Sequence, residues 1–316
     1  MDGYNERVSD SSSDTAACRE LVFMCADTGA VVSLGYTEGK RPALKRAVVF
    51  LSSGETLWIG GEPDGGSRTT LAVRDRGTAG QYDLRLSAPG ALLPGPADLA
   101  GPADPASPEP RPGQRLPVGL ELTVEPASAL LALGQPKPAA GHVTLVRGTG
   151  SLAVGSVIHR VAGSGWSAAR PDDGPGAPTG YRAQAVFQDG SALYVAGDTG
   201  TGDVPVAALV TNTQIRPAPV RDFTVRDAER GRTGRAVSWA ADSRSPAGAT
   251  GQLKDLRQQV TVTRQDPAGP GWLSWGCAPF VFVRSGVTGL GLVERWTRLA
   301  TTVAVAEPAQ EPPDPF

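Results

Sequence analysis

The segment GHVTLVRGTGSLAVGSVIHRVAGSGWSAAR, residues 141–170, alternates strand-forming and polar residues and is punctuated by glycine and serine. Alternating side chains point to opposite faces of a β-strand, and short turns join such strands into antiparallel pairs. The segment ends in a glycine-spaced tryptophan, Trp166, and an arginine, Arg170. We interpret it as paired strands with a β-turn, at which Trp166 and Arg170 either serve packing or reach a ligand pocket or the boundary between two domains.

Similar short runs recur on both sides of this segment. Examples are RAVVFLSS and QYDLRLS before it, and SALYVAGD and LGLVERWTR after it. The chain also contains 40 glycines and 28 prolines. These residues disfavour long helices, because an interior Gly costs about 1 kcal/mol and an interior Pro about 3 kcal/mol relative to Ala. Only ASALLALG and GQLKDLRQQV could hold a helical turn or two, so the sequence predicts an all-β antiparallel sandwich or barrel and excludes βαβ units.

The length of 316 residues fits two domains of ordinary size or one large β architecture. Residues 88–116 include eight prolines among 29 positions, and such a stretch cannot sustain a strand ladder or a helix. Because strand patterning resumes at VGLELTVEP, we interpret 88–116 as an insertion within the first domain. The expected domains are residues 1–135 and 136–306, each with enough strands for a closed or nearly closed sheet, followed by a disordered tail at 307–316.

The charge balance restricts the partners of the chain. Thirty basic and 32 acidic side chains give a formal charge of -2, and no cluster of Lys and Arg supplies the positive surface that nucleic acid or an anionic membrane requires. The start MDGYNERVSDSSSD lacks the basic and apolar regions of a secretory signal, and no apolar run approaches the roughly 20 residues that span a bilayer. We expect a soluble cytoplasmic protein, monomeric or homodimeric, without nucleic-acid partners or membrane insertion.

Few residues suit a metal or a nucleotide. The two histidines, His142 and His159, and the three cysteines, Cys18, Cys25 and Cys277, show no metal-ligand spacing. No Walker motif, G-x-S-x-G elbow or H-E-x-x-H occurs in the sequence. The glycine-rich runs GTGSLAVG and GDTGTGD precede no helix and are therefore interpreted as hairpin turns. We expect neither a metal nor a cofactor.

A carboxylate lies on an apolar strand face near the C-terminus. In LGLVERWTR, alternation places Leu290, Leu292, Glu294 and Trp296 on one face. Such a glutamate lies either in water at the open end of a barrel or desolvated inside its pocket. Burial raises the pKa of a carboxyl group, so in the second case Glu294 could donate a proton or anchor a hydrogen bond.

Aromatic residues on other strands could form the walls of a ligand pocket. Trp58, in ETLWIGGE, is followed by two glycines that would leave room for a ligand, although core packing explains the residue equally well. Tyr181 and Tyr194 offer hydroxyl groups in an apolar frame, or pair across exposed strands. The candidate substrate-binding residues are Trp58, Trp166, Tyr181, Tyr194, Trp275 and Trp296.

The order of the strands from GHVTLVRGTGSLAVGSVIHRVAGSGWSAAR to the closing GVTGLGLVERW resembles the lipocalin-like superfamily of carotenoid 1,2-hydratases and AttH-like proteins. The matching positions are Arg160, Trp166 and Arg170 in a corner motif, and Gly291 and Glu294 in the last strand. The resemblance covers most of residues 136–300, with a weaker echo in residues 20–125. It implies two tandem lipocalin-like antiparallel barrel or sandwich domains.

The same resemblance implies a function. In place of the superfamily's Asp-His pair this chain has the run 161–163, Val-Ala-Gly, which argues against ordinary carotenoid hydration. The superfamily also includes cofactor-free natural-product cyclases, Diels-Alderases among them, that fold a substrate between the two domains. The resemblance thus implies a cofactor-independent cyclase of a hydrophobic polyketide or terpenoid intermediate in secondary metabolism, with Glu294, His159 and Arg160 as catalytic residues. The alternatives are a hydratase or isomerase that uses Glu294 as the acid, and a non-catalytic carrier of lipophilic ligands.

Overall fold

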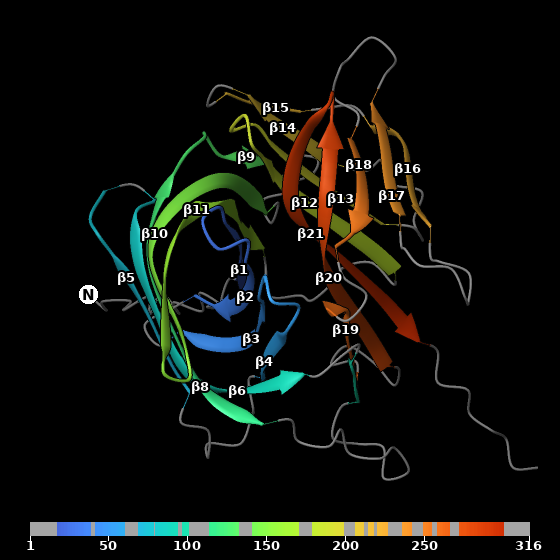
Figure 1. The fold of residues 1–316 in the computed structure, drawn as a ribbon. Coiled ribbons are helices and arrows are strands. Elements are labelled where there is room, and N and C mark those ends of the chain that lie inside the picture. The colour runs from blue at the N-terminus through green and yellow to red at the C-terminus, as the bar shows by residue number, and fades with distance from the viewer. Residues whose placement is uncertain are drawn as a thin grey trace, which may run out of the picture.

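The fold consists of two β-sheets that lie side by side (Figure 1). The computed structural model describes residues 18–38, 42–60, 69–78, 80–93, 97–100, 114–132, 141–170, 179–198, 206–211, 214–217, 220–226, 236–241, 249–254, 258–265 and 272–299. Within these ranges there is no α-helix, and hence none long and apolar enough to cross a membrane. The all-β prediction is confirmed.

The first sheet closes into an eight-stranded antiparallel barrel. Around the barrel the strands follow the order β11 (Val157–Arg170), β1 (Cys18–Cys25), β2 (Val31–Thr37), β3 (Ala43–Phe50), β4 (Thr56–Gly60), β6 (Tyr82–Leu93), β8 (Arg115–Pro126) and β10 (His142–Val154). Pairing of β10 with β11 completes the ring. Two short strands extend it, β5 (Thr70–Asp75) on β6 and β9 (Leu131–Ala132) on β10.

The segment quoted at the outset forms the hairpin that closes this barrel. Val154 pairs with Val157 across a turn in which Gly155 has a φ of 61°, the left-handed conformation that tight hairpin turns require. From Val157 the chain runs as one 14-residue strand to Arg170, so the β-turn expected beside Trp166 is not present. The turn precedes His159 instead, and the side chain of Arg170 lies outside the described residues.

The first sheet also extends beyond the domain boundary predicted at 135/136. Strands β10 and β11 pair with β8 and β1, so the division between the sheets falls between Arg170 and Thr179. The closing hairpin gives the barrel's first and last strands partners and removes two exposed edges, which strand patterning alone could not reveal. The predicted tail, residues 307–316, lies outside the described residues.

Part of the proline-rich stretch 88–116 forms strands, contrary to prediction. Strand β6 continues to Leu93, with Pro89 directly opposite Pro117 of β8. At a non-hydrogen-bonded position of an antiparallel ladder, the two facing residues donate no N–H to each other. Two opposed prolines, which lack an N–H, are therefore tolerated there. Strand β7 (Ala97–Ala100) then pairs in parallel with β19 (Val260–Gln265) of the second sheet, and so links the two sheets.

The second sheet follows the order β15 (Gln214–Pro217), β14 (Val206–Thr211), β13 (Ala192–Asp198), β12 (Thr179–Phe187), β21 (Val287–Leu299), β20 (Trp272–Arg284), β18 (Ala249–Leu253), β17 (Ala236–Ala241) and β16 (Val220–Arg226). Strand β19 also pairs with β20. The two segments with helical potential contribute strand residues instead, at Leu131–Ala132 and within Ala249–Leu253. Packing against neighbouring strands therefore outweighs their weak local helical preference.

Alternation along the strands sorts the apolar side chains into separate cores. In β1, Leu21, Phe23 and Cys25 point into the barrel, whereas Val22 and Met24 join a cluster shared by both sheets. We call this shared layer the seam. Its principal members are Val22, Met24, Val31, Val48, Phe50 and Trp166 from the barrel, and Tyr194, Val210, Val260, Cys277 and Leu292 from the second sheet.

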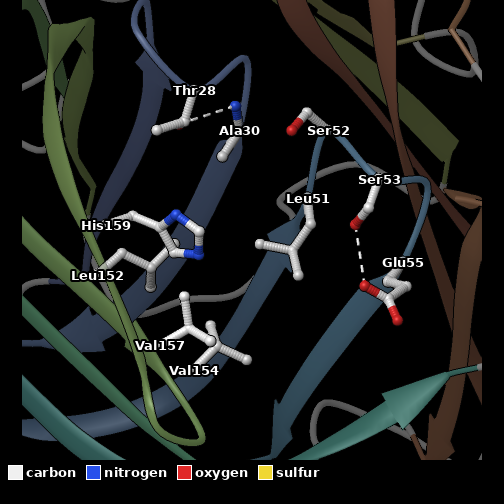
Figure 2. Close-up of a pocket in the computed structure, with 10 residues that line it drawn as sticks. All are labelled: Thr28, Ala30, Leu51, Ser52, Ser53, Glu55, Leu152, Val154, Val157 and His159. Carbon is white, nitrogen blue, oxygen red and sulfur yellow. Dashed lines mark hydrogen bonds between the residues drawn. The ribbon is translucent and has the colours of Figure 1, made fainter.

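One end of the barrel contains a hollow of about 310 Å³ (Figure 2). It is bounded by the turns that follow β1, β3 and β10, which the antiparallel order brings to the same end. His159 of β11 and Glu55 of the β3–β4 turn both line it.

Candidate functional site

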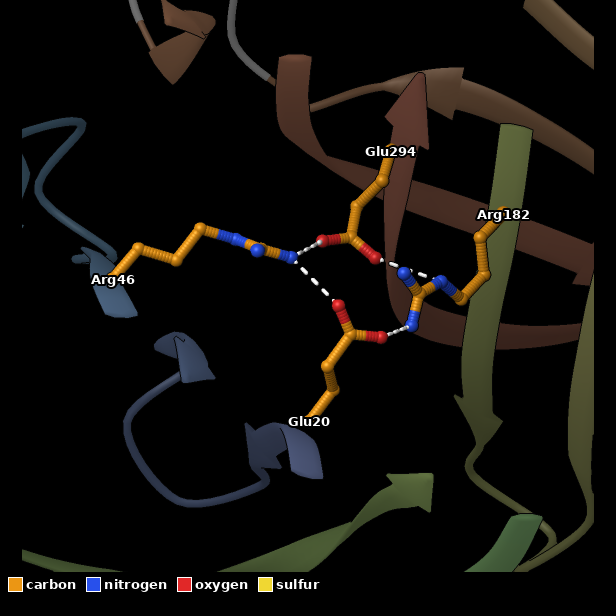
Figure 3. A network of polar contacts seen from close by, with 4 residues as sticks. All are labelled: Glu20, Arg46, Arg182 and Glu294. Carbon is orange, nitrogen blue, oxygen red and sulfur yellow. Dashed lines mark hydrogen bonds and ion pairs between the residues drawn. The ribbon is translucent and has the colours of Figure 1, made fainter. Parts of the chain in front are cut away.

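Four charged side chains form a closed ring of ion pairs between the two sheets (Figure 3). Glu20 of β1 and Arg46 of β3 come from the barrel, and Arg182 of β12 and Glu294 of β21 come from the second sheet. We call these four residues the quartet. Each arginine contacts both carboxylates, so the formal charges of the quartet cancel.

The contacts differ in length and burial. Arg46 Nη2 lies 2.8 Å from Glu20 Oε1 and 3.5 Å from Glu294 Oε1. Arg182 Nε lies 3.0 Å from Glu294 Oε2, and Arg182 Nη1 donates to Glu20 Oε2. The side chains of Arg182 and Glu294 are 3% and 2% exposed, whereas those of Arg46 and Glu20 are 21% and 14% exposed. The quartet therefore runs from a rim that solvent reaches to a buried inner end.

Arg46 lies over the ring of a tryptophan. Its guanidinium carbon is 4.5 Å from the centre of the Trp275 ring, and the Trp58 and Trp275 rings are 6.3 Å apart. Gly35 is the cross-strand partner of Arg46 on β2, and a Cβ there would be in ordinary van der Waals contact with Arg46 Nη1, at 3.4 Å. Stacking on an indole ring favours a guanidinium through its charge and its flat shape.

Several buried polar atoms near the quartet have no hydrogen-bond partner among the described residues. They include Arg46 Nε, the indole nitrogens of Trp275 and Trp296, and the Gln184 amide oxygen. Arg182 Nε and Glu294 Oε2 are within ion-pair distance but also lack hydrogen-bond geometry. An unpaired buried polar atom costs about 1–3 kcal/mol, so these atoms call for partners such as ordered water or a bound ligand.

Trp296 covers the inner end of the quartet. It pairs across strands with Gly180 and with Trp275, and the Arg182 guanidinium lies 5.9 Å from its ring centre. Its indole ring lies so close over Gly180 that a Cβ there would collide with it. Beside Glu294, Cys277 is fully buried, and burial together with the nearby carboxylate raises the pKa of its thiol well above the ordinary value.

The structure brings together part of the predicted site. Glu294 is a member of the quartet, Trp275 and Trp296 lie against its two arginines, and Trp58 lies beside Trp275. Its predicted neighbours Leu290 and Leu292 do share its face, although that face packs in the seam rather than inside a barrel.

The other predicted aromatic residues divide between the two faces of the second sheet. Trp166 and Tyr194 pack together in the seam with ring centres 5.6 Å apart, and the Trp166 indole N–H donates to the Ala185 carbonyl at 3.3 Å. Tyr181 instead belongs to the core on the other face of β12, with Phe280. Tyr181 therefore does not point into the seam.

His159 and Arg160 lie far from the quartet. Along β11, Ala168, the cross-strand partner of Glu20, is nine positions from His159, a span of about 30 Å at the usual rise of a strand. His159 lines the hollow at the barrel end, and the Arg160 side chain is exposed. The expectation that these two residues act together with Glu294 in one site is not met, because a continuous strand replaces the expected turn.

Sequence reasoning overlooked three members of the quartet, although the signal that marked Glu294 marks them too. Glu20 alternates with Val22 and Met24, and Arg46 alternates with Val48 and Phe50, so each is a charge at the end of an apolar strand face. Arg182 carries a weaker signal, because its strand face continues with the polar Gln184 before Val186. Among the residues with described side chains, no group of three His, Cys, Asp or Glu residues could hold a metal ion.

No protein-family model and no curated protein matches the chain. Several solved structures are similar to the chain. Kievitone hydratase from Nectria haematococca is 12% identical, with 89% of each chain covered and a TM-score of 0.51. An AttH-like protein from Nitrosomonas europaea is 13% identical over 93% of this chain and 97% of that one, with a TM-score of 0.49. CghA is 13% identical, with 90% of this chain and 89% of that chain covered and a TM-score of 0.46.

The chain is thus a two-sheet β protein with a lipocalin-like fold, whose sheets are joined by a partly buried ring of ion pairs. The similarity to kievitone hydratase covers most of both chains and confirms the fold that the sequence resemblance implied. A shared fold carries many different activities, so the reaction must be argued from the site.

Proposed function

We propose that the protein is an enzyme that binds a hydrophobic polyketide or terpenoid intermediate at the seam and cyclises it without a cofactor. The observation that carries the proposal is the set of unpaired polar atoms around the quartet, set among the indole rings of Trp58, Trp275 and Trp296. Hydrogen-bond donors held in an apolar frame suit a substrate that is mostly hydrocarbon and carries a few oxygen atoms.

Arg46 is the member of the quartet that a substrate meets first, because its side chain is the most exposed of the four. Glu20 and Glu294 orient its guanidinium through Nη2, and the Trp275 ring lies 4.5 Å from the guanidinium carbon. In the proposed complex a substrate carbonyl accepts hydrogen bonds from Arg46 and from the Trp275 indole N–H. Donors that are fixed before the reaction stabilise developing negative charge on such an oxygen without reorganisation.

The ring-forming step needs no proton transfer. In a cycloaddition, two carbon–carbon bonds form from π electrons of one folded chain, no atom is lost, and the product is an isomer of the substrate. The indoles of Trp58 and Trp275 would hold the diene and its partner in contact, and such positioning can supply about 7–11 kcal/mol of the barrier when the geometry is near that of reaction. Polarising the conjugated carbonyl lowers the remaining barrier.

The hydratase alternative assigns Glu294 as the proton donor. Each oxygen of its carboxylate contacts a guanidinium group, at 3.5 Å and 3.0 Å, and a proton on either oxygen would oppose that contact. This arrangement favours a role in which Glu294 orients the two arginines. The carrier alternative uses the same apolar seam without the chemical step.

Mass spectrometry in heavy water distinguishes the three functions. Purified protein is incubated with the linear intermediate that accumulates when its gene is deleted, and heat-unfolded protein controls for spontaneous cyclisation. A cyclase yields an isomer without carbon-bound deuterium, at a rate that the unfolded control lacks. A product heavier by one water would identify a hydratase, and a bound but unchanged ligand would identify a carrier; either result would refute the proposal.

A further inference from the structure

The hollow at the end of the barrel is separate from the seam and is bounded by ordered turns. Gln258 holds the β3–β4 turn, since its side-chain nitrogen donates to the Leu51 carbonyl at 2.6 Å and to the Glu55 carbonyl at 3.1 Å. Lys254 holds the β1–β2 turn, since its Nζ donates to the Gly29 carbonyl at 3.0 Å. The hollow is therefore bounded by turns that contacts from the second sheet fix in place.

The wall of the hollow is mostly apolar. Leu51, Leu152, Val154 and Val157 contribute hydrocarbon side chains around the imidazole of His159 (Figure 2). A volume of about 310 Å³ lies at the lower end of the range for small-molecule pockets, so it suits a molecule with a single ring. An imidazole in an apolar wall is a directional hydrogen-bond partner for one polar group.

The charged groups near the hollow carry both signs. Glu55 is the charged side chain among the lining residues, and the Ser53 hydroxyl donates to its Oε2 at 2.9 Å. The ammonium group of Lys254 lies at the neighbouring turn. With Glu55 in the lining, Asp27 in the β1–β2 turn and the Lys254 ammonium group at that turn, charges of both signs lie around the opening, so an uncharged ligand suits the apolar wall best.

We propose that this hollow is a second ligand site, which binds an uncharged monocyclic alcohol or phenol with its hydroxyl group hydrogen-bonded to His159. The aromatic or aliphatic ring lies against Leu51, Leu152 and Val154, and the hydroxyls of Thr28 and Ser52 complete the polar side of the site. The shortest connection between the two sites along a strand, from Leu51 back to Arg46 of β3, spans about 17 Å, so a small ligand in the hollow does not contact the quartet.

The two histidines provide a direct test by NMR. His142 pairs with Ala169, about 30 Å along the hairpin from His159, and so reports non-specific binding. Thymol is the probe, and p-cymene, which has the same skeleton without the hydroxyl group, is its control. Thymol should shift the imidazole resonances of His159 saturably and leave those of His142 in place. Shifts at both histidines, or at neither, would overturn the proposal.

Calorimetry tests the hydrogen bond and the location. One hydrogen bond corresponds to about tenfold tighter binding of thymol than of p-cymene, and His159→Phe should abolish that difference while p-cymene still binds. Val154→Trp, which fills the hollow, should abolish binding of both, and Val157→Trp at the rim provides a second blocking variant should the first not fold. Equal affinity for the two probes, or undiminished binding in both tryptophan variants, would refute the site. Neither binding experiment measures turnover. A negative result in them therefore does not bear on the proposed cyclase activity, and a negative result in the cyclase assay does not bear on this ligand site.

Discussion

Replacing Glu294 by alanine tests whether the quartet holds the two sheets together. Glu294 is 2% exposed and contacts Arg182 and Arg46, so its removal leaves the buried Arg182 guanidinium with Glu20 alone. Breaking a buried ion pair from one side costs about 3–5 kcal/mol. Since Glu20 still compensates part of the charge, we expect a loss of about 3 kcal/mol in the free energy of unfolding, at the lower end of that range.

The assay is urea unfolding followed by tryptophan fluorescence and circular dichroism, with the two signals compared to confirm a single transition. Glu121→Ala is the matched control, because its pair with Arg85 is long, at 3.8 Å, and exposed, and should cost less than about 1 kcal/mol. A double variant, Glu294→Met with Arg182→Met, should be more stable than Glu294→Ala, because no buried charge is left unpaired.

The reasoning would be refuted by a Glu294→Ala variant that loses less than about 1 kcal/mol, or by a double variant less stable than the single one. Either result would mean that Arg182 is well solvated in the folded protein, contrary to its 3% exposure.

Three further predictions concern packing and titration. Gly180→Ala should destabilise the protein by about 1–3 kcal/mol and alter the near-ultraviolet dichroism of Trp296, whereas Gly276→Ala, where the nearest atom would be 3.5 Å away, should change neither. Burial raises the pKa of the Cys25 thiol to about 11, so a thiol reagent at pH 8 should modify Cys25 only after unfolding; rapid labelling of the folded protein would contradict this. Burial also raises the pKa of Tyr181 to about 12 against an ordinary value of about 10, so folding favours its protonated form. Its contribution to stability is present below pH 10 and is lost as the pH rises from 10 to 12, and Tyr181→Phe should flatten that part of the profile.

The fold could be predicted well from the sequence because the strand pattern is local. Alternation of side chains and glycine turns marked most strands correctly, including the face shared by Leu290, Leu292 and Glu294. Which sheet a strand joins, by contrast, depends on partners far away in the sequence. The hairpin at 142–170 joins the first sheet because it closes the barrel against β1 and β8, and no residue within the hairpin signals that choice.

The candidate site could be predicted only in part for the same reason. Glu20 and Arg182 are 162 positions apart and meet only when the two sheets pack together. Glu20 appears in the sequence as a single charge at the end of an apolar strand face, and Arg182 as a charge on a strand face that also carries Gln184. His159 and Arg160 follow a glycine turn that resembles a corner, but the extended strand carries them away from Glu294.

The most direct test of the central claim, that catalysis occurs beside the quartet, is kcat/KM of the Arg46→Lys variant with the linear intermediate. Lysine keeps the positive charge but loses the flat guanidinium that stacks on Trp275 and bridges two carboxylates. The account predicts a fall of about 100-fold, the scale of losing one fixed donor to a developing oxyanion, with little change in the unfolding midpoint. Arg85→Lys, at a side chain that is 73% exposed, should match the wild type. Wild-type kcat/KM in Arg46→Lys would contradict the claim and place the reaction away from the seam.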